Sequence, residues 1–284
     1  MTAQTLAPPS GTSTHRAPGP ARHRVRHLVA DTGTMIGRSL RLVRRDPDEL
    51  LLAVLLPVMM MLLFVYVFGG AMQVGTDYIT YATPGVILLC AGYGASNTAL
   101  AVQQDMAGGI VDRFRSLPIA SSTMLTGHVV ASVVKNLVST VIVFGVAFLI
   151  GFRADATALE WCGAIAMIVL YVLAITWVAT FVGVLAHTPA AAGGFGFFML
   201  FLPYVSSAFV PPETMPSWMR GFAENQPITS VIETTRGLLV GTGSDGSPVT
   251  DLGPTAWLAV AWTAGITAVF LVAAAVAFAR RRRQ

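Results

Sequence analysis

The sequence predicts an all-α polytopic membrane protein with six transmembrane helices. The chain has 284 residues, of which 54 % are hydrophobic and 11 % charged, whereas soluble domains carry about 25 % charged residues. A hydrocarbon core about 30 Å thick needs about 20 apolar residues of helix to cross it, and several runs meet this requirement without a charge. The third observation is the position of the arginines, which lie between and beyond these runs and not inside them.

The six expected spans follow one another through short polar or glycine-containing segments. They cover residues 49–69, 78–103, 125–152, 161–185, 192–210 and 255–279. The uncharged part of the third span, 136–152, has 17 residues, which is about 25 Å of helix. Its N-terminal flank must therefore contribute to a full crossing. Cys90 and Cys162 are expected to be small buried hydrophobic residues and not part of a metal site.

The N-terminal region is expected to be a tail and not a membrane signal. Residues 1–24 are rich in Thr, Ala, Pro, Ser, His and Arg and contain no apolar signal segment. This composition predicts a disordered cytoplasmic tail. The transmembrane domain is expected to occupy residues 47–284.

An amphipathic helix is predicted at residues 25–46, directly before the first span. Its apolar side chains share one helical face, and Arg38, Arg41 and Arg45 lie on another. Pro47 ends it, because the residue before a proline is pushed out of the α region. We expect the helix to lie along the inner leaflet. An ordinary solvated helix is the alternative.

The basic residues concentrate in three regions: before span 1, between spans 2 and 3, and after span 6. If these regions are cytoplasmic, 14 of the 18 basic residues lie inside, which is the positive-inside asymmetry. The pattern requires an even number of spans with both termini in the cytosol. It explains the net charge of +4 without a nucleic-acid partner. The ratio of 17 Arg to 1 Lys hints at a GC-rich bacterial genome, and hence at a bacterial plasma membrane.

The spans contain no evident source of energy for transport. Apart from Glu49 at the first position of the first span, they have no Asp or Glu, which ion-coupled carriers usually need inside the membrane. The single lysine, Lys135, follows Val134 and not the glycine that a phosphate-binding loop requires. We expect Lys135 to reach the inner interface as an anchor. The chain is therefore predicted to be no enzyme, to hold no cofactor or metal, and to transport passively or take its energy from a partner.

The segment between spans 2 and 3 is charged and cannot remain in lipid. Its apolar residues have i, i+4, i+7 spacing, and its charged residues project elsewhere. This pattern is typical of a helix that docks into a groove of a cytosolic partner; a solvated turn is the alternative. The candidate coupling residues are Ile110, Asp112, Arg113, Phe114, Arg115 and Leu117.

Residues 211–253, between spans 5 and 6, predict two short helices. Trp218 and Phe222 follow one proline, and a second helical pattern places Glu233 and Arg236 at i,i+3 spacing, where they can pair. Both helices are too short to cross the membrane. We expect them to be re-entrant and to close the outer end of the bundle. A folded surface loop is the alternative.

The substrate is expected to be hydrophobic or amphipathic. Spans 1, 2 and 5 offer aromatic, methionine and small side chains without fixed charge, and such a wall adapts to many apolar shapes. For many of these residues, packing against lipid is the alternative. The candidate pathway residues are Met60, Phe64, Tyr93, Asn97, Phe201 and Tyr204.

Three phrases resemble a known family. They are "VDRFRSLPIA" in the charged segment, the 209–241 phrase "FVPPETMPSWMRGFAENQPITSVIETTRGLLVG", and "RDPDELLLAVLLPVMMMLLF" at span 1. They are similar to type-2 permeases of bacterial ATP-binding-cassette (ABC) transporters, in particular the daunorubicin/doxorubicin-resistance family. The resemblance covers roughly residues 35–280. Similar permeases often carry Glu before the coupling helix, where this chain has Gln103, Gln104 and Asp105.

The resemblance implies a permease subunit of an ATP-driven exporter of antibiotic-like molecules. Two permease chains, identical or paired with a sister chain, would form the pathway. Two ABC ATPase subunits would bind ATP and Mg beneath them, each with a groove for the coupling helix. An exporter of a lipid or a lipid-linked glycan is the first alternative. A carrier or scaffold that needs no ATPase is the second.

Overall fold

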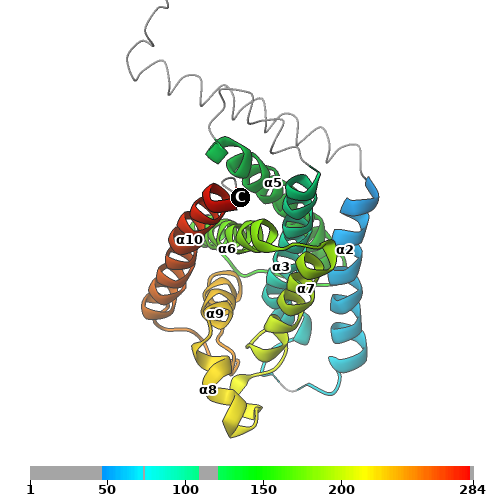
Figure 1. Ribbon diagram of the computed structural model, residues 1–284. Coiled ribbons are helices and arrows are strands. Elements are labelled where there is room, and N and C mark those ends of the chain that lie inside the picture. Colours follow the sequence, from blue (N-terminus) through cyan, green and yellow to red (C-terminus); the bar gives the residue numbers. More distant parts are fainter. Residues whose placement is uncertain (1–46, 73, 109–120, 282–284) are drawn as a thin grey trace, which may run out of the picture.

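One helix, α3 (Tyr78–Ala107), lies at the centre of the helical bundle (Figure 1). The structure is a computed structural model that describes residues 47–72, 74–108 and 121–281. The predicted tail at 1–24 and the amphipathic helix at 25–46, with Arg38, Arg41 and Arg45, lie outside these residues. The other main helices are α2 (Pro47–Leu62), α5 (Ser121–Leu149), α6 (Ala158–Leu185), α7 (Pro189–Phe201), α8 (Ser217–Asn225), α9 (Pro227–Val240) and α10 (Gly253–Arg281).

Helix α3 is central because most of its surface is covered by other helices. It packs against α2, α5, α6, α7 and α9, and 78 % of its membrane-length segment is buried. Helices α2 and α10 lie at the periphery, where only 17 % of the corresponding segment is buried in each. A helix that is apolar on all sides is expected either in a protein core or in lipid. Helix α3 is of the first kind, and α2 and α10 are of the second.

Among the residues that the structure describes, five helices are long and apolar enough to cross a membrane. They are α2 with its π-helical continuation η1 (Leu63–Phe68), α3, α5, α6 and α10. These helices confirm a polytopic, α-helical membrane protein, and their bounds lie close to those expected. Helix α5 begins at Ser121, so the flank of the apolar run at 136–152 does contribute to the span.

The helix expected at 192–210 is shorter than the sequence suggested. Helix α7 starts behind Thr188, whose hydroxyl accepts the N–H of Ala191 at 3.2 Å. It ends at Phe201 and continues as one 3₁₀ turn, η2 (Leu202–Val205). Pro203 lies in this turn and has no N–H to donate to a carbonyl of the preceding helical turn.

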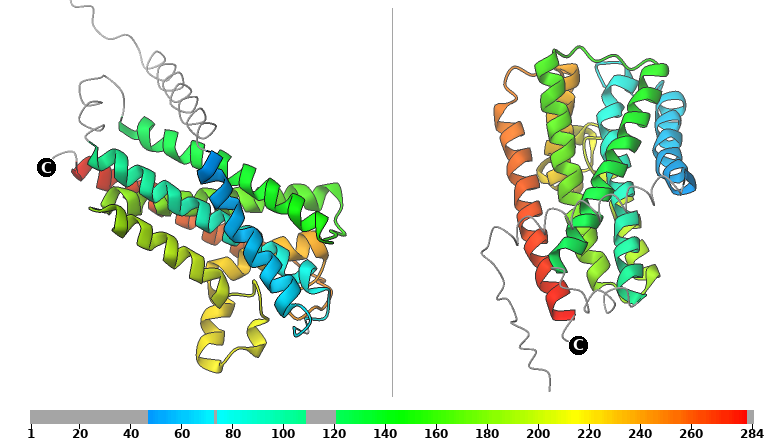
Figure 2. Two further views of the ribbon diagram at one scale, coloured as in Figure 1. Left: turned by 90° about the vertical axis from the view of Figure 1, so that its right-hand side faces the viewer. Right: turned by 90° about the horizontal axis from the view of Figure 1, so that it is seen from above.

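The bundle has two chemically different ends (Figure 2). At the end that we call the basic end, α10 finishes with Arg280 and Arg281, and the Arg281 guanidinium donates to the carbonyl oxygens of Val184 and Ala186 at the end of α6. At the opposite end lie the α5–α6 and α9–α10 connections. There the Asp155 N–H donates to the carbonyl of Leu239 at 3.1 Å.

The two cysteines differ in their surroundings. Cys90 is fully buried on α3, as expected, but Cys162 is exposed. The expectation for Cys162 was wrong because this residue lies near the start of α6, on the face that points away from the bundle, together with the exposed Ile165. Apolar composition alone does not tell a lipid-facing position from a core position.

Helices α3 and α6 approach so closely at Gly183 that no side chain fits between them. A Cβ atom on Gly183 would lie 2.5 Å from the Ala99 carbonyl oxygen and 2.8 Å from the Val102 Cβ. Small residues at such crossings allow the dispersion contacts that hold membrane helices together. The crossing therefore depends on glycine at this position.

The substitution Gly183→Ala should lower the thermal stability of the detergent-solubilised protein. The added methyl group forces the backbones apart, an overpacking effect of about 1–3 kcal/mol. Gly145→Ala on α5 is the matched control, because no atom lies within 4 Å of its built Cβ and alanine is the better helix former. Thermal unfolding followed by size-exclusion chromatography should separate the two variants. Equal midpoints would contradict the close crossing.

Candidate functional site

The predicted coupling segment itself is outside the described residues. This applies to Ile110, Asp112, Arg113, Phe114, Arg115 and Leu117. The structure does describe the two helix ends that flank it, the C-terminus of α3 and the N-terminus of α5. Residues 109–120 are joined covalently to these two helix ends, so a displacement of the segment is transmitted to α3 and α5. The contacts between the two ends are therefore the first part of the candidate site.

A side-chain hydrogen bond joins the two flanking helices directly. His128 Nε2 on α5 lies 2.9 Å from Asp105 Oδ2 on α3, and both side chains are about three-quarters buried. Asp105 belongs to the stretch in which similar permeases often carry Glu. No sequence pattern indicates that the two residues meet, because 23 positions separate them.

Below this contact, a polar seam continues between α3 and α5 toward the middle of the bundle. The hydroxyls of Thr98 and Ser132 share a hydrogen bond, and Asn136 Nδ2 donates to Ser132 Oγ at 3.4 Å. Gln103 is five residues after Thr98 and therefore on another face of α3; it is 1 % exposed, and neither atom of its amide has a hydrogen-bond partner among the described residues. Buried polar groups without partners are uncommon and usually have a functional or hydration role. The seam is therefore the most polar interior part of the described spans.

Lys135 also belongs to this interior and not to the interface. Its side chain is 8 % exposed, so the expectation that it reaches the inner surface as an anchor was wrong. The physical reason is helical register: Lys135 is three residues after Ser132 and four before Ser139, on the buried face of α5. The side chain of Lys135 is therefore not exposed at the surface of the bundle.

The opposite end is organised by the guanidinium group of Arg236 on α9, which is fully buried. Its Nη1 donates to Glu233 Oε1 at 2.6 Å, which confirms the predicted i,i+3 pairing. Its Nη2 donates to the carbonyl of Ser207 at 2.5 Å, and its Nε to the carbonyl of Tyr81 at 3.3 Å. The guanidinium carbon also lies 4.0 Å from the centre of the Tyr81 ring, a cation–π contact. One side chain thus binds α9, α3 and the segment after α7.

Two tyrosines of α3 reinforce the same junction. The Tyr81 hydroxyl donates to the Ser207 carbonyl and the Tyr78 hydroxyl to the Phe209 carbonyl, both at 3.0 Å. Sequence reasoning missed these partners, because their acceptors are backbone carbonyls more than 120 positions away, which have no side-chain signature. The signal that the sequence does contain is the spacing of Tyr78 and Tyr81, which places two aromatic hydroxyls one helical turn apart near the start of a mainly apolar span.

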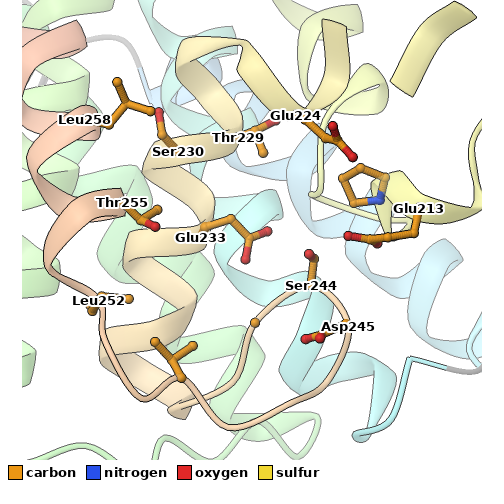
Figure 3. A pocket seen from close by; sticks show the side chains of 13 residues that line it. Glu213, Glu224, Thr229, Ser230, Glu233, Ser244, Asp245, Leu252, Thr255 and Leu258 are labelled. Carbon is orange, nitrogen blue, oxygen red and sulfur yellow. The ribbon is translucent and has the colours of Figure 1, made fainter. Parts of the chain in front are cut away.

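Beside this junction, acidic side chains line a cavity of about 400 Å³ (Figure 3). Glu213, Glu224, Glu233 and Asp245 reach it from four different segments. Glu233 is paired with Arg236, and Glu224 with Arg220 at 2.7 Å. Hydrogen bonds from Ser247 hold the pKa of Asp245 below its usual value, so this carboxylate remains charged at neutral pH. The opposite end therefore presents a locally negative hollow in a chain with a net charge of +4.

Four of the six candidate pathway residues form one cluster. The Phe64 ring lies 6.0 Å from that of Tyr204, and Phe201 lies 6.2 Å from Tyr204 on its other side. The Tyr204 hydroxyl lies 3.1 Å from the sulfur of Met60. Tyr93 and Asn97 are half-buried one turn apart on α3, and none of the ring contacts of the described residues joins Tyr93 to this cluster.

The aromatic residues of α8 point outward. Trp218 is 80 % and Phe222 55 % exposed, and their i,i+4 spacing places them on one helical face. Large exposed aromatics at the end of a membrane bundle are typical of the membrane–water interface. The expected re-entrant insertion of this segment stays a prediction.

These features define a polytopic α-helical membrane protein with a polar interior, in which helices α3 and α5 are held together close to the ends that flank residues 109–120. The chain belongs to the ABC-2 type transporter family, which matches residues 31–240. It is 30 % identical to the daunorubicin resistance ABC transporter permease protein DrrB1 of Streptomyces coeruleorubidus, over 85 % of this chain and 83 % of that protein.

Other relatives cover a similar part of the chain. The probable doxorubicin resistance ABC transporter permease protein DrrC of Mycobacterium tuberculosis is 27 % identical over 93 % of this chain and 94 % of that protein. The putative transport permease ycf38 of Pyropia yezoensis is 24 % identical over 74 % of each. The resemblance inferred from the three sequence phrases is thereby confirmed.

Replacing Arg236 should destabilise the protein far more than replacing Arg220. Arg236→Gln keeps a polar side chain but leaves the Ser207 and Tyr81 carbonyls and the Glu233 carboxylate without their charged partner, and breaking a buried pair costs about 3–5 kcal/mol. Arg220→Gln removes an exposed pair and should change little. Fluorescence-detected thermal unfolding of both purified variants tests this. A wild-type midpoint for Arg236→Gln would show that the junction does not hold the opposite end together.

Proposed function

We propose that the chain is the permease subunit of an ATP-driven exporter that moves a hydrophobic or amphipathic, antibiotic-like small molecule out of a bacterial cell. The observation that carries this proposal is the similarity, over most of both chains, to permeases named for daunorubicin and doxorubicin resistance. The exporting direction and the use of ATP follow from that family membership.

The proposed topology has six crossings with both termini in the cytosol. Helix α7 has 13 residues and η2 has 4, which together extend about 27 Å. This is close to the hydrocarbon thickness of about 30 Å, and the flanking residues can complete the crossing. The basic end, with Arg280 and Arg281, then faces the cytosol, and the acidic cavity faces outward.

The energy for transport would come from a separate ABC ATPase. Residues 109–120 connect α3 to α5 along the chain, and the contact between Asp105 and His128 ties these two helices together close to the ends that flank the segment. A force applied to the coupling segment would therefore move both helices together. ATP binding to the partner can shift the transport states only by its differential affinity for them, and this paired attachment supplies the mechanical link.

The pathway would lie between two permease chains, identical or paired with a sister chain. The cluster of Phe64, Phe201 and Tyr204 joins helices near the periphery of the bundle, where exposed apolar side chains are frequent. Aromatic rings and a thioether bind apolar substrates without demanding one shape. Two copies of this surface would enclose a cavity suited to flat, amphipathic molecules.

Transport by inverted membrane vesicles tests the function directly. Vesicles that contain the permease and its cognate ATPase should accumulate an aromatic polyketide when ATP is supplied, and should not accumulate it with a non-hydrolysable analogue. A glycolipid in place of the polyketide tests the alternative substrate class. Accumulation of the glycolipid alone would favour a lipid exporter. Transport that persists without the ATPase would contradict the proposal and favour a self-sufficient carrier.

Replacing Phe114 by Ala should abolish substrate-stimulated ATPase activity and leave membrane insertion intact. The expected reason is loss of the aromatic anchor in the ATPase groove. Phe148→Ala is the control, since Phe148 is a partly exposed side chain near the opposite end of α5. ATP hydrolysis by the purified complex, with and without substrate, measures the effect. Full stimulation of an assembled Phe114→Ala complex would overturn the assigned role of this residue.

A further inference from the structure

A second cavity lies at the basic end, in a groove between α6 and α10. Its volume is about 460 Å³, and it is separate from the acidic cavity and from the aromatic cluster. One side of the groove is formed by the last turns of α6 and the other by the last turns of α10. Neither the coupling mechanism nor the proposed pathway uses this place.

The mouth of the groove is basic. His187, Arg280 and Arg281 line it, and none of the described residues that line it is acidic. Arg281 donates to the carbonyls of Val184 and Ala186, so its position at the mouth is fixed by the end of α6. Arg280 and His187 are exposed beside it. The mouth therefore presents two or three positive charges to a ligand, depending on the protonation of the imidazole.

The walls of the groove are apolar, and small residues make room between them. Val184 and Leu185 form one wall, and Ala273, Val276 and Ala277 the other. From Ala273 to Arg280 the groove follows eight residues of α10, and the helix rises about 10 Å between the two. Toward the middle of the bundle, an edge-to-face contact between the rings of Phe181 and Phe270, with centres 5.4 Å apart, joins the two helices.

Positive charge at the mouth and hydrocarbon below it match one class of ligand. We propose that this groove binds one anionic phospholipid of the inner leaflet, with its phosphate at Arg280 and His187 and the first part of an acyl chain between α6 and α10. A soluble phosphate or a nucleotide would satisfy the charges but would leave the apolar walls in contact with water. The proposal rests on the orientation proposed above, in which the basic end faces the cytosol. It does not depend on which substrate is transported or on whether the chain is an exporter.

Native mass spectrometry of the full-length protein, titrated with phosphatidylglycerol or phosphatidylcholine of equal chain length, tests the headgroup. The protein should retain phosphatidylglycerol in preference to phosphatidylcholine. Because one basic residue near a membrane contributes about a fivefold effect on binding to anionic lipid, Arg280→Gln should weaken phosphatidylglycerol retention about fivefold and leave phosphatidylcholine unchanged. Equal retention of both lipids by the wild type would overturn the proposal.

A matched pair of alanine variants tests the walls. Ala277→Phe fills the groove without changing any charge and should abolish the preference for phosphatidylglycerol. Ala275→Phe places the same ring on the exposed face of α10 and should behave like the wild type. Far-ultraviolet circular dichroism and the elution volume confirm folding, and Arg280→Gln keeps the proposal testable if Ala277→Phe does not fold. Unchanged retention by a folded Ala277→Phe variant would refute the groove as the site.

Two further outcomes identify other occupants. If inorganic phosphate displaces phosphatidylglycerol at equal concentration, the apolar walls add nothing and the groove is not a lipid site. If Arg280→Gln releases the ATPase subunit from the complex but leaves lipid retention unchanged, the basic mouth is a protein contact. Both results would overturn the assignment.

Discussion

The buried guanidinium of Arg236 is the interaction on which the architecture of the opposite end depends. Desolvating a cation costs several kcal/mol, and here the cost is offset by a carboxylate, two backbone carbonyls and an aromatic ring. These partners come from α9, from α3 and from the segment after α7, so the charge can be accommodated only if all three are in place. The short helix α9, which could not be stable alone, thereby becomes part of the bundle.

The two ends of the bundle use polar chemistry in different ways. At the opposite end, charge is locked into one arrangement and lines an acidic hollow. At the basic end, the contact between Asp105 and His128 holds two helices together, while the buried amide of Gln103, on another face of α3, has no partner among the described residues. The buried charge of Arg236 at the opposite end is therefore fully paired, whereas this buried amide at the basic end is not.

The periphery of the bundle is suited to a larger assembly. Helix α2 and its continuation η1 expose Leu51, Leu55, Met59 and Tyr66, and the aromatic cluster lies where η1 contacts η2, next to the end of α7. These exposed apolar side chains can pack either against lipid or against a second permease chain. Where α6 and α10 finish at the basic end, the basic mouth beside an apolar groove instead suits the single anionic lipid that we propose. The surface therefore has at least two kinds of apolar region, which differ in the charge beside them.

The sequence by itself determined the class of the protein, its family and most of its helices. Long apolar runs must be helical in lipid, because no water is present to bind unpaired backbone groups, and the pairing of Glu233 with Arg236 follows from helical spacing. Only the tertiary structure decided which polar side chains are interior. Lys135 is buried and Cys162 exposed because of helical register within the bundle, and Arg236 finds backbone carbonyls that no sequence pattern marks. Apolar periodicity is weak when both the core and the lipid are apolar, so contacts between distant segments fix the orientation of each helix.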